Sequence, residues 1–90
     1  MKRKNKLIIK KLEEYLEVEL SRFERQFMNE DSPIQRNNLY WYAIQRGYGA
    51  IDFAMLLGLD QNIADELNTK YRNKLEELLY PTLQDEYSML

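Results

Sequence analysis

One segment limits the folds open to this chain more than any other feature. Residues 39–59 contain 15 apolar residues and three glycines, and their only other side chains are Gln45, Arg46 and Asp52. As a helix, this segment is apolar nearly all round, whereas a helix of a small bundle hides about a third to a half of its circumference. We therefore expect a second copy of the chain or a larger partner to cover the excess apolar face.

Amphipathic helices are expected on both sides of this segment. Apolar residues spaced by three and four draw one stripe over about residues 5–28: Ile9, Leu12, Leu16, Leu20, Phe23 and Phe27. The charged residues between them, Glu19 and Arg22 included, are placed on solvated faces. A third helix over about residues 61–79 is predicted to bury Ile63, Ala64, Leu67, Tyr71, Leu75 and Leu78.

Start and stop signals separate the three helices. Ser32 followed by Pro33, with Gln35 three residues after the serine, has the form of a capping box and predicts a second helix over about residues 33–57. Gly58 fits the left-handed position that ends this helix, and Asp60 fits the N-cap of the next. The tail, residues 81–90, is expected either to dock as a short turn or to be a flexible terminus.

Two glycines leave the middle of the second helix open to two interpretations. Gly47 and Gly49 either let a neighbouring helix approach closely within one continuous helix, or break the segment near Tyr48. We favour a continuous or kinked helix. The expected fold is all-α, with residues 1–90 forming one domain. It is an up-down-up bundle of three helices with a central, nearly all-apolar second helix and a short C-terminal appendix.

Composition argues against catalysis. The chain has no cysteine and no histidine, which removes disulfides, thiolate chemistry, the usual zinc ligands and the commonest general base. Glu13, Glu14 and Glu17 share one side of the first helix, where we interpret them as a solvated surface rather than as a metal site. We expect a protein that is not an enzyme and that uses no cofactor.

The apolar segment is long enough to cross a bilayer, but its charges oppose insertion. Arg46 and Asp52 lie near its middle, where each costs about 2.5–3.5 kcal/mol. The basic residues after Met1 are followed by only three apolar residues, Leu7–Ile9, before Lys10, which is too short for a secretory signal. We expect no membrane insertion and a cytoplasmic location.

Partner binding is predicted from the aromatic and charged residues of the second helix. Tyr40, Trp41 and Tyr42 spread over about 200° of the helix, so all three rings cannot enter one core. One interpretation buries Trp41 and Tyr42 with Tyr40 at the boundary. The other is an aromatic interface built around Tyr40, Trp41 and Tyr48, in which Tyr40→Ala weakens association and leaves helicity intact.

Arg46 and Asp52 also have two interpretations. Both side chains reach water at the edge of the bundle, or they find partners on another helix or on a second subunit. In the second case they contribute to the specificity of association. The candidate partner-binding residues are therefore Tyr40, Trp41, Tyr48, Arg46 and Asp52.

The two ends of the chain differ in charge. The first eleven residues carry six positive charges, on Lys2, Arg3, Lys4, Lys6, Lys10 and Lys11. The remaining 79 residues have a net charge of −8. This asymmetry suggests self-association or an anionic partner for the basic arm, and it argues against a nucleic-acid surface over the whole domain.

A helix-turn-helix is only weakly indicated. The tight turn at Gly58 has loosely matching spacing, but the following helix begins with Asp60, Asp65 and Glu66 and has no cation before Lys70, where phosphate contacts need positive charge. The leading hypothesis is a small interaction or regulatory protein that docks a helix face onto itself, as a homodimer, or onto another protein. It is the kind of accessory factor that bacteria and phages encode. The alternative is a nucleic-acid-binding regulator that uses the basic arm.

Overall fold

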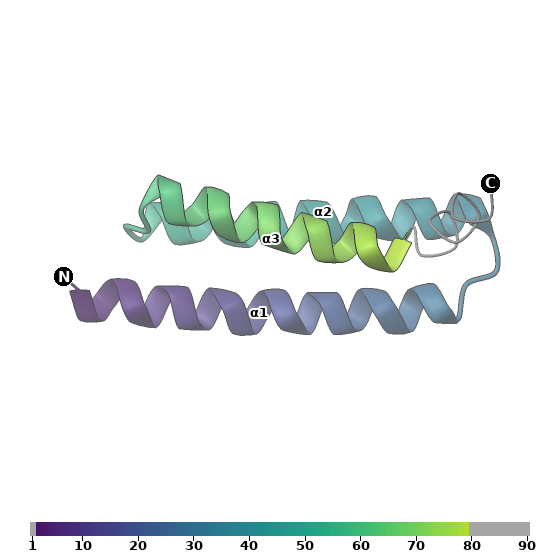
Figure 1. Cartoon of the computed structure of the whole chain (residues 1–90), viewed down its shortest axis with the longest axis horizontal. Coiled ribbons are helices and arrows are strands. Elements are labelled where there is room, and N and C mark those ends of the chain that lie inside the picture. Colours follow the sequence, from purple (N-terminus) through teal and green to yellow (C-terminus); the bar gives the residue numbers. More distant parts are fainter. Residues whose placement is uncertain (1, 80–90) are drawn as a thin grey trace, which may run out of the picture.

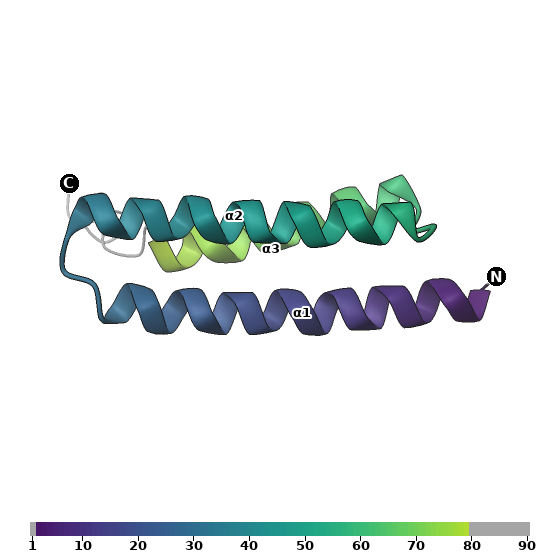
Figure 2. The ribbon, with the colours of Figure 1, turned by 180° about the vertical axis from the view of Figure 1, so that it is seen from behind.

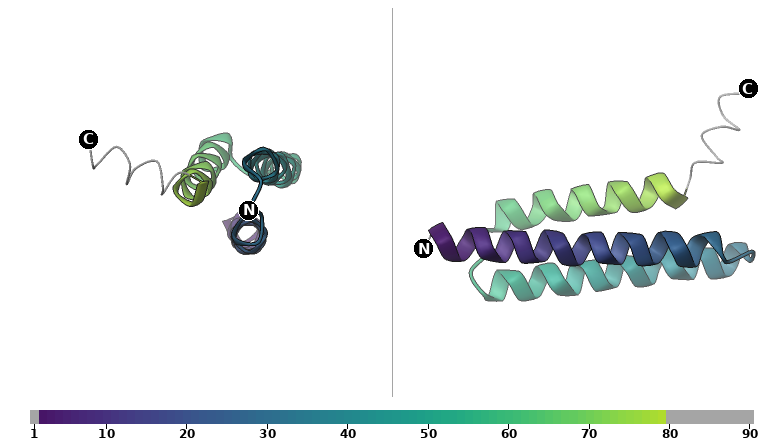
Figure 3. Two further views of the ribbon diagram at one scale, coloured as in Figure 1. Left: turned by 90° about the vertical axis from the view of Figure 1, so that its right-hand side faces the viewer. Right: turned by 90° about the horizontal axis from the view of Figure 1, so that it is seen from below.

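Over residues 2–79, the protein is an all-α bundle of three helices. A computed structural model describes the backbone of residues 2–79 and the side chains of residues 5–79. The helices are α1 (Lys2–Met28), α2 (Pro33–Leu56) and α3 (Gln61–Leu79). They run up, down and up, as Figures 1 and 2 show from two sides. Viewed end-on they occupy the corners of a triangle (Figure 3), so that every helix packs against the other two.

The core of the bundle confirms the predicted stripes of α1 and α3. Leu12, Leu16 and Phe23 of α1 and Ala64, Tyr71 and Leu75 of α3 are buried. Their spacings of four and seven residues bring them onto one side of each helix, where apolar area leaves water. The remaining predicted stripe residues are partly buried against this core: Ile9, Leu20, Phe27, Ile63, Leu67 and Leu78. The helix bounds differ from expectation mainly at the N-terminus, because α1 begins at Lys2.

The start of α2 is held by local contacts, of which the sequence predicted the cap at Ser32 but not those made by Glu30 and Arg36. Ser32 is the N-cap, and its hydroxyl accepts a hydrogen bond of 3.4 Å from the backbone amide of Gln35. The Ser32 amide in turn donates to the carboxylate of Glu30 at 3.1 Å. Arg36 of the first turn donates to the Glu30 carbonyl, and its guanidinium lies 4.5 Å from the centre of the Phe27 ring.

The turn between α2 and α3 also follows prediction. Gly58 has a φ of 110°, in the region that favours glycine at the end of a helix. Leu59 closes the turn by donating from its amide to the carbonyl of Ala54. Asp60 then caps α3, because its carboxylate accepts a bond of 2.7 Å from the Asn62 amide. These contacts turn the chain so that α3 runs back along α2 as far as the hydrogen bond between Glu76 and Tyr40.

The glycines of α2 do not break it. The helix is continuous through Gly47 and Gly49, and Gly47 lies against the ring of Tyr71 from α3. A Cβ at residue 47 would lie within 3 Å of two ring carbons of Tyr71, so only glycine leaves room for this ring. The Tyr71 hydroxyl completes the contact by donating to the carbonyl of Ala43 at 2.7 Å. Of the two interpretations of these glycines, close approach is therefore correct for Gly47.

The aromatic run of α2 is arranged differently from both sequence interpretations. Tyr40 is only 6% exposed, whereas Trp41 is 53% and Tyr42 57% exposed. The buried side of α2 passes through Tyr40, Ala43, Ile44, Gly47, Ile51 and Ala54. The rings of Trp41 and Tyr42 lie about 100° and 200° away from that of Tyr40 around the helix, which turns them out of the core. The prediction that Tyr40 is the boundary ring was wrong.

The predicted tail, residues 81–90, lies outside the described residues. Within residues 2–79, no helix combines the length and the apolarity needed to cross a membrane.

Candidate protein-docking groove between α1 and α2

An apolar groove runs along the outer side of the α1–α2 pair. We call it the α1–α2 groove. It has a volume of about 650 Å³ and is lined by Leu7, Ile8, Lys11, Leu12 and Tyr15 from α1 and by Arg46, Gly49, Ala50, Phe53, Ala54 and Leu57 from α2 and the residue after it. None of these residues belongs to α3, which packs on the other sides of both helices (Figure 3).

The walls of the groove are large apolar side chains that water still reaches. Phe53 is 61% exposed and Leu57 44% exposed on the α2 side, and Leu7 is 57% exposed on the α1 side. Between the walls, Gly49 leaves an open space, because a Cβ placed there meets no atom within 4 Å. Exposed apolar side chains around a shallow hollow are typical of a surface that binds another protein.

A buried ion pair closes one end of the groove. Glu19 of α1 is 1% exposed, and its carboxylate accepts a hydrogen bond of 2.6 Å from Nε of Arg46. Arg22 lies on the other oxygen at 3.2 Å. The prediction that Glu19 faces solvent was wrong, because Arg46 enters from α2 and compensates its charge. The pattern of α1 alone contains no sign of this partner.

Tyr15 joins this polar end. Burial, followed by the negative charge of Glu19 and a hydrogen bond with it, raises the pKa of the Tyr15 hydroxyl. Burial also raises the pKa of the Tyr71 hydroxyl, on which the charge of Glu19 acts in the same direction. Nη2 of Arg46 is buried and has no hydrogen-bond partner among the described residues. The contact of its Nε with Glu19 ties Arg46 to α1 at the groove.

The structure separates the five candidate partner-binding residues. Arg46 lines the groove and has a partner on α1, as one interpretation of this pair predicts. Asp52 is exposed, as the other interpretation predicts. Trp41 and Tyr48 lie on another side of α2, on an exposed stripe that continues every seven residues from Ile34 to Met55. Tyr40 belongs to the core, where its hydroxyl donates to Glu76 at 3.3 Å.

Sequence reasoning missed Leu7, Tyr15, Phe53 and Leu57 as groove residues. In α1, Leu7 and Tyr15 fall beside the main apolar stripe, and their spacing of eight residues puts them on one side of a helix. That spacing is a signal that sequence reasoning could have used. In α2 no comparable signal exists, because apolar residues surround the whole helix and do not distinguish a core side from a docking side.

The basic residues near the start of the chain lie in the first turns of α1. Lys6, Lys10 and Lys11 are exposed, and Nζ of Lys11 lies 3.7 Å from the carboxylate of Glu14. Lys2, Arg3 and Lys4 belong to the same helix, but their side chains are not among those described.

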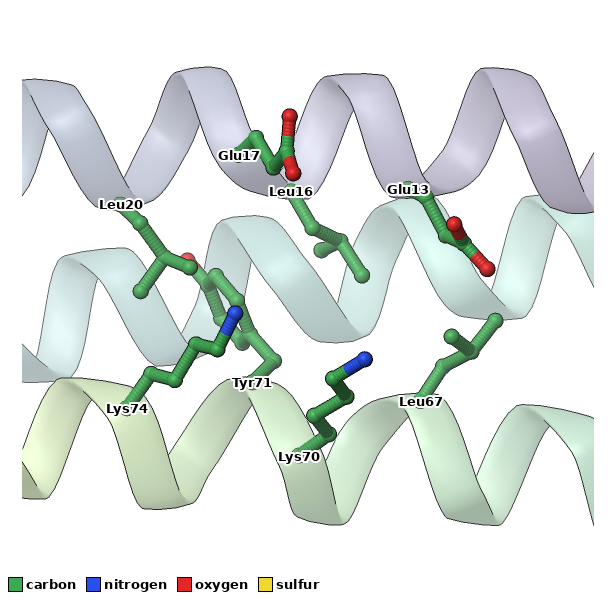
Figure 4. A pocket seen from close by; sticks show the side chains of 8 residues that line it. All are labelled: Glu13, Leu16, Glu17, Leu20, Leu67, Lys70, Tyr71 and Lys74. Carbon is green, nitrogen blue, oxygen red and sulfur yellow. The ribbon is translucent and has the colours of Figure 1, made fainter.

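A second, much smaller hollow lies between α1 and α3 (Figure 4). Glu13 and Glu17 of α1 and Lys70 and Lys74 of α3 surround an apolar floor of Leu16, Leu20, Leu67 and Tyr71. Its volume of about 50 Å³ has room for a few water molecules at most. Within the described part of the chain, no group of three or more acidic side chains is arranged to hold a metal ion. We interpret the charged side chains around this hollow as a contact that aligns α3 with α1.

No family model, no curated protein and no solved structure matches this chain.

Proposed function

We propose that this protein is a non-enzymatic interaction module that docks a helix into the α1–α2 groove. The observation that carries the proposal is the row of exposed apolar walls, Leu7, Phe53 and Leu57, around the open space at Gly49. Leaving this much apolar surface in water costs free energy, and a docked helix recovers it.

The shape of the groove favours a helix as its ligand. Leu7 to Tyr15 spans about 12 Å along α1, which matches two to three turns of a docked helix. A hollow between two antiparallel helices is where bundles seat a further helix, with apolar anchors at positions i, i+3 or i+4, and i+7. The ligand would thus complete a local four-helix arrangement with α1, α2 and α3.

The chemistry around the groove favours binding over catalysis. Glu19, the buried carboxylate, is engaged by two arginines, Arg46 and Arg22, and is not free to act as a base. The chain has neither a histidine nor a cysteine to serve as a nucleophile or proton carrier. In this proposal the protein is a small regulatory factor of the bacterial or phage cytoplasm, a setting that fits its length and its lack of cysteine.

Selection of helical peptides tests the proposal. A displayed library of amphipathic helices is selected on the wild-type protein and then screened against the variants Phe53→Gln and Trp41→Gln. Both residues are exposed aromatics of α2, but only Phe53 lines the groove. The proposal is supported if Phe53→Gln weakens peptide binding about 30-fold or more while Trp41→Gln changes it less than threefold. If neither a peptide nor a second copy of the chain binds in a way that depends on Phe53, the proposal is wrong.

The alternative is an anion-binding role for the first turns of α1. The exposed ammonium groups of Lys6 and Lys10 favour it, since they are available to phosphates. A gel-shift titration on duplex DNA and on RNA, at two salt concentrations, tests it. Binding that weakens with salt and is lost when Lys6 and Lys10 become Gln supports this role, and no binding at low salt removes it.

A further inference from the structure

We infer that the occupant of the α1–α2 groove is a second copy of this chain, paired through antiparallel α2 helices across a two-fold axis. This inference rests on the proposed docking function and specifies its partner. Three observations carry it: the apolar area around the groove, the position of small residues along α2, and the charge of the groove.

The apolar area around the groove is a substantial part of what a stable dimer buries. Leu7, Tyr15, Phe53 and Leu57 line the groove and are substantially exposed, and three further exposed side chains, Val18, Tyr42 and Leu56, lie beside it at spacings of three, four and seven residues from lining residues. An aromatic side chain buries ~150–250 Å² when covered, and the three rings here are each about half exposed. With the four aliphatic side chains, this side offers several hundred Å² of apolar area, the scale of the ~800 Å² per partner that stable complexes bury.

Small residues lie where two α2 helices would cross. Gly49 and Ala50 follow one another in the groove, and the space beside Gly49 is open. Larger side chains flank this pair at equal distances along the helix. Arg46 lies three residues before Gly49, and Phe53 lies three residues after Ala50. Tyr42 and Leu57 lie seven residues before and after the same pair. In an antiparallel two-fold contact centred on Gly49 and Ala50, Arg46 of one copy therefore faces Phe53 of the other, and Tyr42 faces Leu57.

The contacts of such a pair follow from the symmetry. The two Gly49–Ala50 steps meet on the axis, which lets the helices approach closely. Each Phe53 enters the groove of the other copy and packs on the flat face of the partner's Arg46, which Glu19 already holds in position. Each Tyr42 lies beside the partner's Leu57. A contact of this kind uses the same surface on both copies and closes at two chains.

The charge of the groove favours this neutral occupant over an acidic one. The cations that line the groove, Lys11 and Arg46, are each paired with a carboxylate of α1, Glu14 and Glu19. The groove therefore has little unpaired positive charge to attract an acidic partner. The α2 surface from Tyr42 to Leu57 suits such a groove, because its groove side is apolar apart from Arg46 itself.

Solution mass by sedimentation velocity over a dilution series tests the inference. We expect wild-type protein at about twice the chain mass of 10.9 kDa, dissociating on dilution. Gly49→Gln and Phe53→Gln should raise the dissociation constant about 30-fold or more while leaving the helical circular dichroism unchanged, because neither residue is enclosed within one copy. Trp41→Gln, on another side of α2, should leave the constant within threefold.

Single cysteines give an independent measurement, since the natural chain has none. Gly49→Cys lies next to the proposed axis and should form a disulfide-linked dimer under mild oxidation, because the two Cα atoms fall within the range of about 4.4–6.8 Å that the bond requires. Trp41→Cys should remain a monomer on a non-reducing gel.

Each remaining outcome contradicts the inference. A wild-type monomer at every concentration overturns it, and so does a dimer that survives both Gly49→Gln and Phe53→Gln or that Trp41→Gln disrupts. If the wild type is a monomer but selected helical peptides still bind in the groove, only the second copy is wrong and the docking function stands. If neither binds, both fail.

Discussion

At the scale of single residues, the Glu19–Arg46 pair joins α1 to α2 through a buried carboxylate. Glu19→Gln keeps the shape of the side chain but leaves the arginine charge without its buried counterion. Removing one partner of a buried pair costs about 3–5 kcal/mol, and because Arg46 is one-third exposed we expect a loss of about 2–3 kcal/mol in unfolding free energy. Urea denaturation measures it.

A double variant separates the charge from the packing. Glu19→Leu with Arg46→Met replaces both partners by apolar groups, and we expect it to lose less stability than Glu19→Gln alone. An equal or larger loss in the double variant would mean that the shape of these side chains, rather than their charges, stabilises the contact. All unfolding measurements on such variants are made in the Phe53→Gln background, so that association does not contribute.

Tyr71 makes stability depend on pH in the alkaline range. Its pKa is raised above the ordinary value of 10.0, mainly by burial, so the folded chain keeps a proton that the unfolded chain releases. The stabilisation is complete below pH 10 and is lost as the pH rises above it, by up to about 1.4 kcal/mol per pH unit. Urea denaturation between pH 8 and 11 should show a shallower decline for Tyr71→Phe than for wild type.

The matched control for this measurement is Tyr48→Phe. Tyr48 is exposed on a side of α2 away from the groove, so its substitution should leave the decline as it is in the wild type. Tyr71→Phe also loses the hydrogen bond to Ala43, which lowers stability by about 1 kcal/mol at all pH values and therefore does not change the slope. Equal slopes in all three proteins would contradict the role assigned to Tyr71.

At the scale of the elements, two glycines of α2 should respond in opposite ways to alanine. Gly49→Ala meets no atom within 4 Å and should stabilise the helix by about 0.5–1 kcal/mol. Gly47→Ala places its Cβ 2.3 Å from a ring carbon of Tyr71, and we expect a net loss of about 1–2 kcal/mol. Thermal unfolding in the Phe53→Gln background measures both, and effects of the same sign would contradict the packing described here.

The same elements show which features could be read from sequence. Ser32, Gly58 and Asp60 act through contacts with residues a few positions away, so their roles were predictable. The α1 stripe was predictable because polar residues surround it. The buried side of α2 was not, because its apolar residues face every direction and the choice depends on where α1 and α3 pack. The burial of Glu19 escaped prediction because its partner is 27 positions away.

At the scale of the whole molecule, the proposed dimer makes thermal stability depend on concentration. A bundle of this size that hides its groove only by association should melt at a higher temperature when concentrated, because mass action favours the folded dimer. For a dimer of two 90-residue chains we expect a rise of about 4 °C for each tenfold increase in concentration. Differential scanning calorimetry from micromolar to millimolar protein measures this dependence.

The variant Phe53→Gln supplies the comparison for this last measurement. Without its main anchor in the partner's groove, its rise in melting temperature should begin at a concentration about 30-fold or more above that of the wild type. Trp41→Gln should keep the concentration dependence, because its side of α2 lies away from the groove. A wild-type melting temperature that does not change with concentration would mean that three helices alone account for the stability of the bundle, with the groove left open for a different helix.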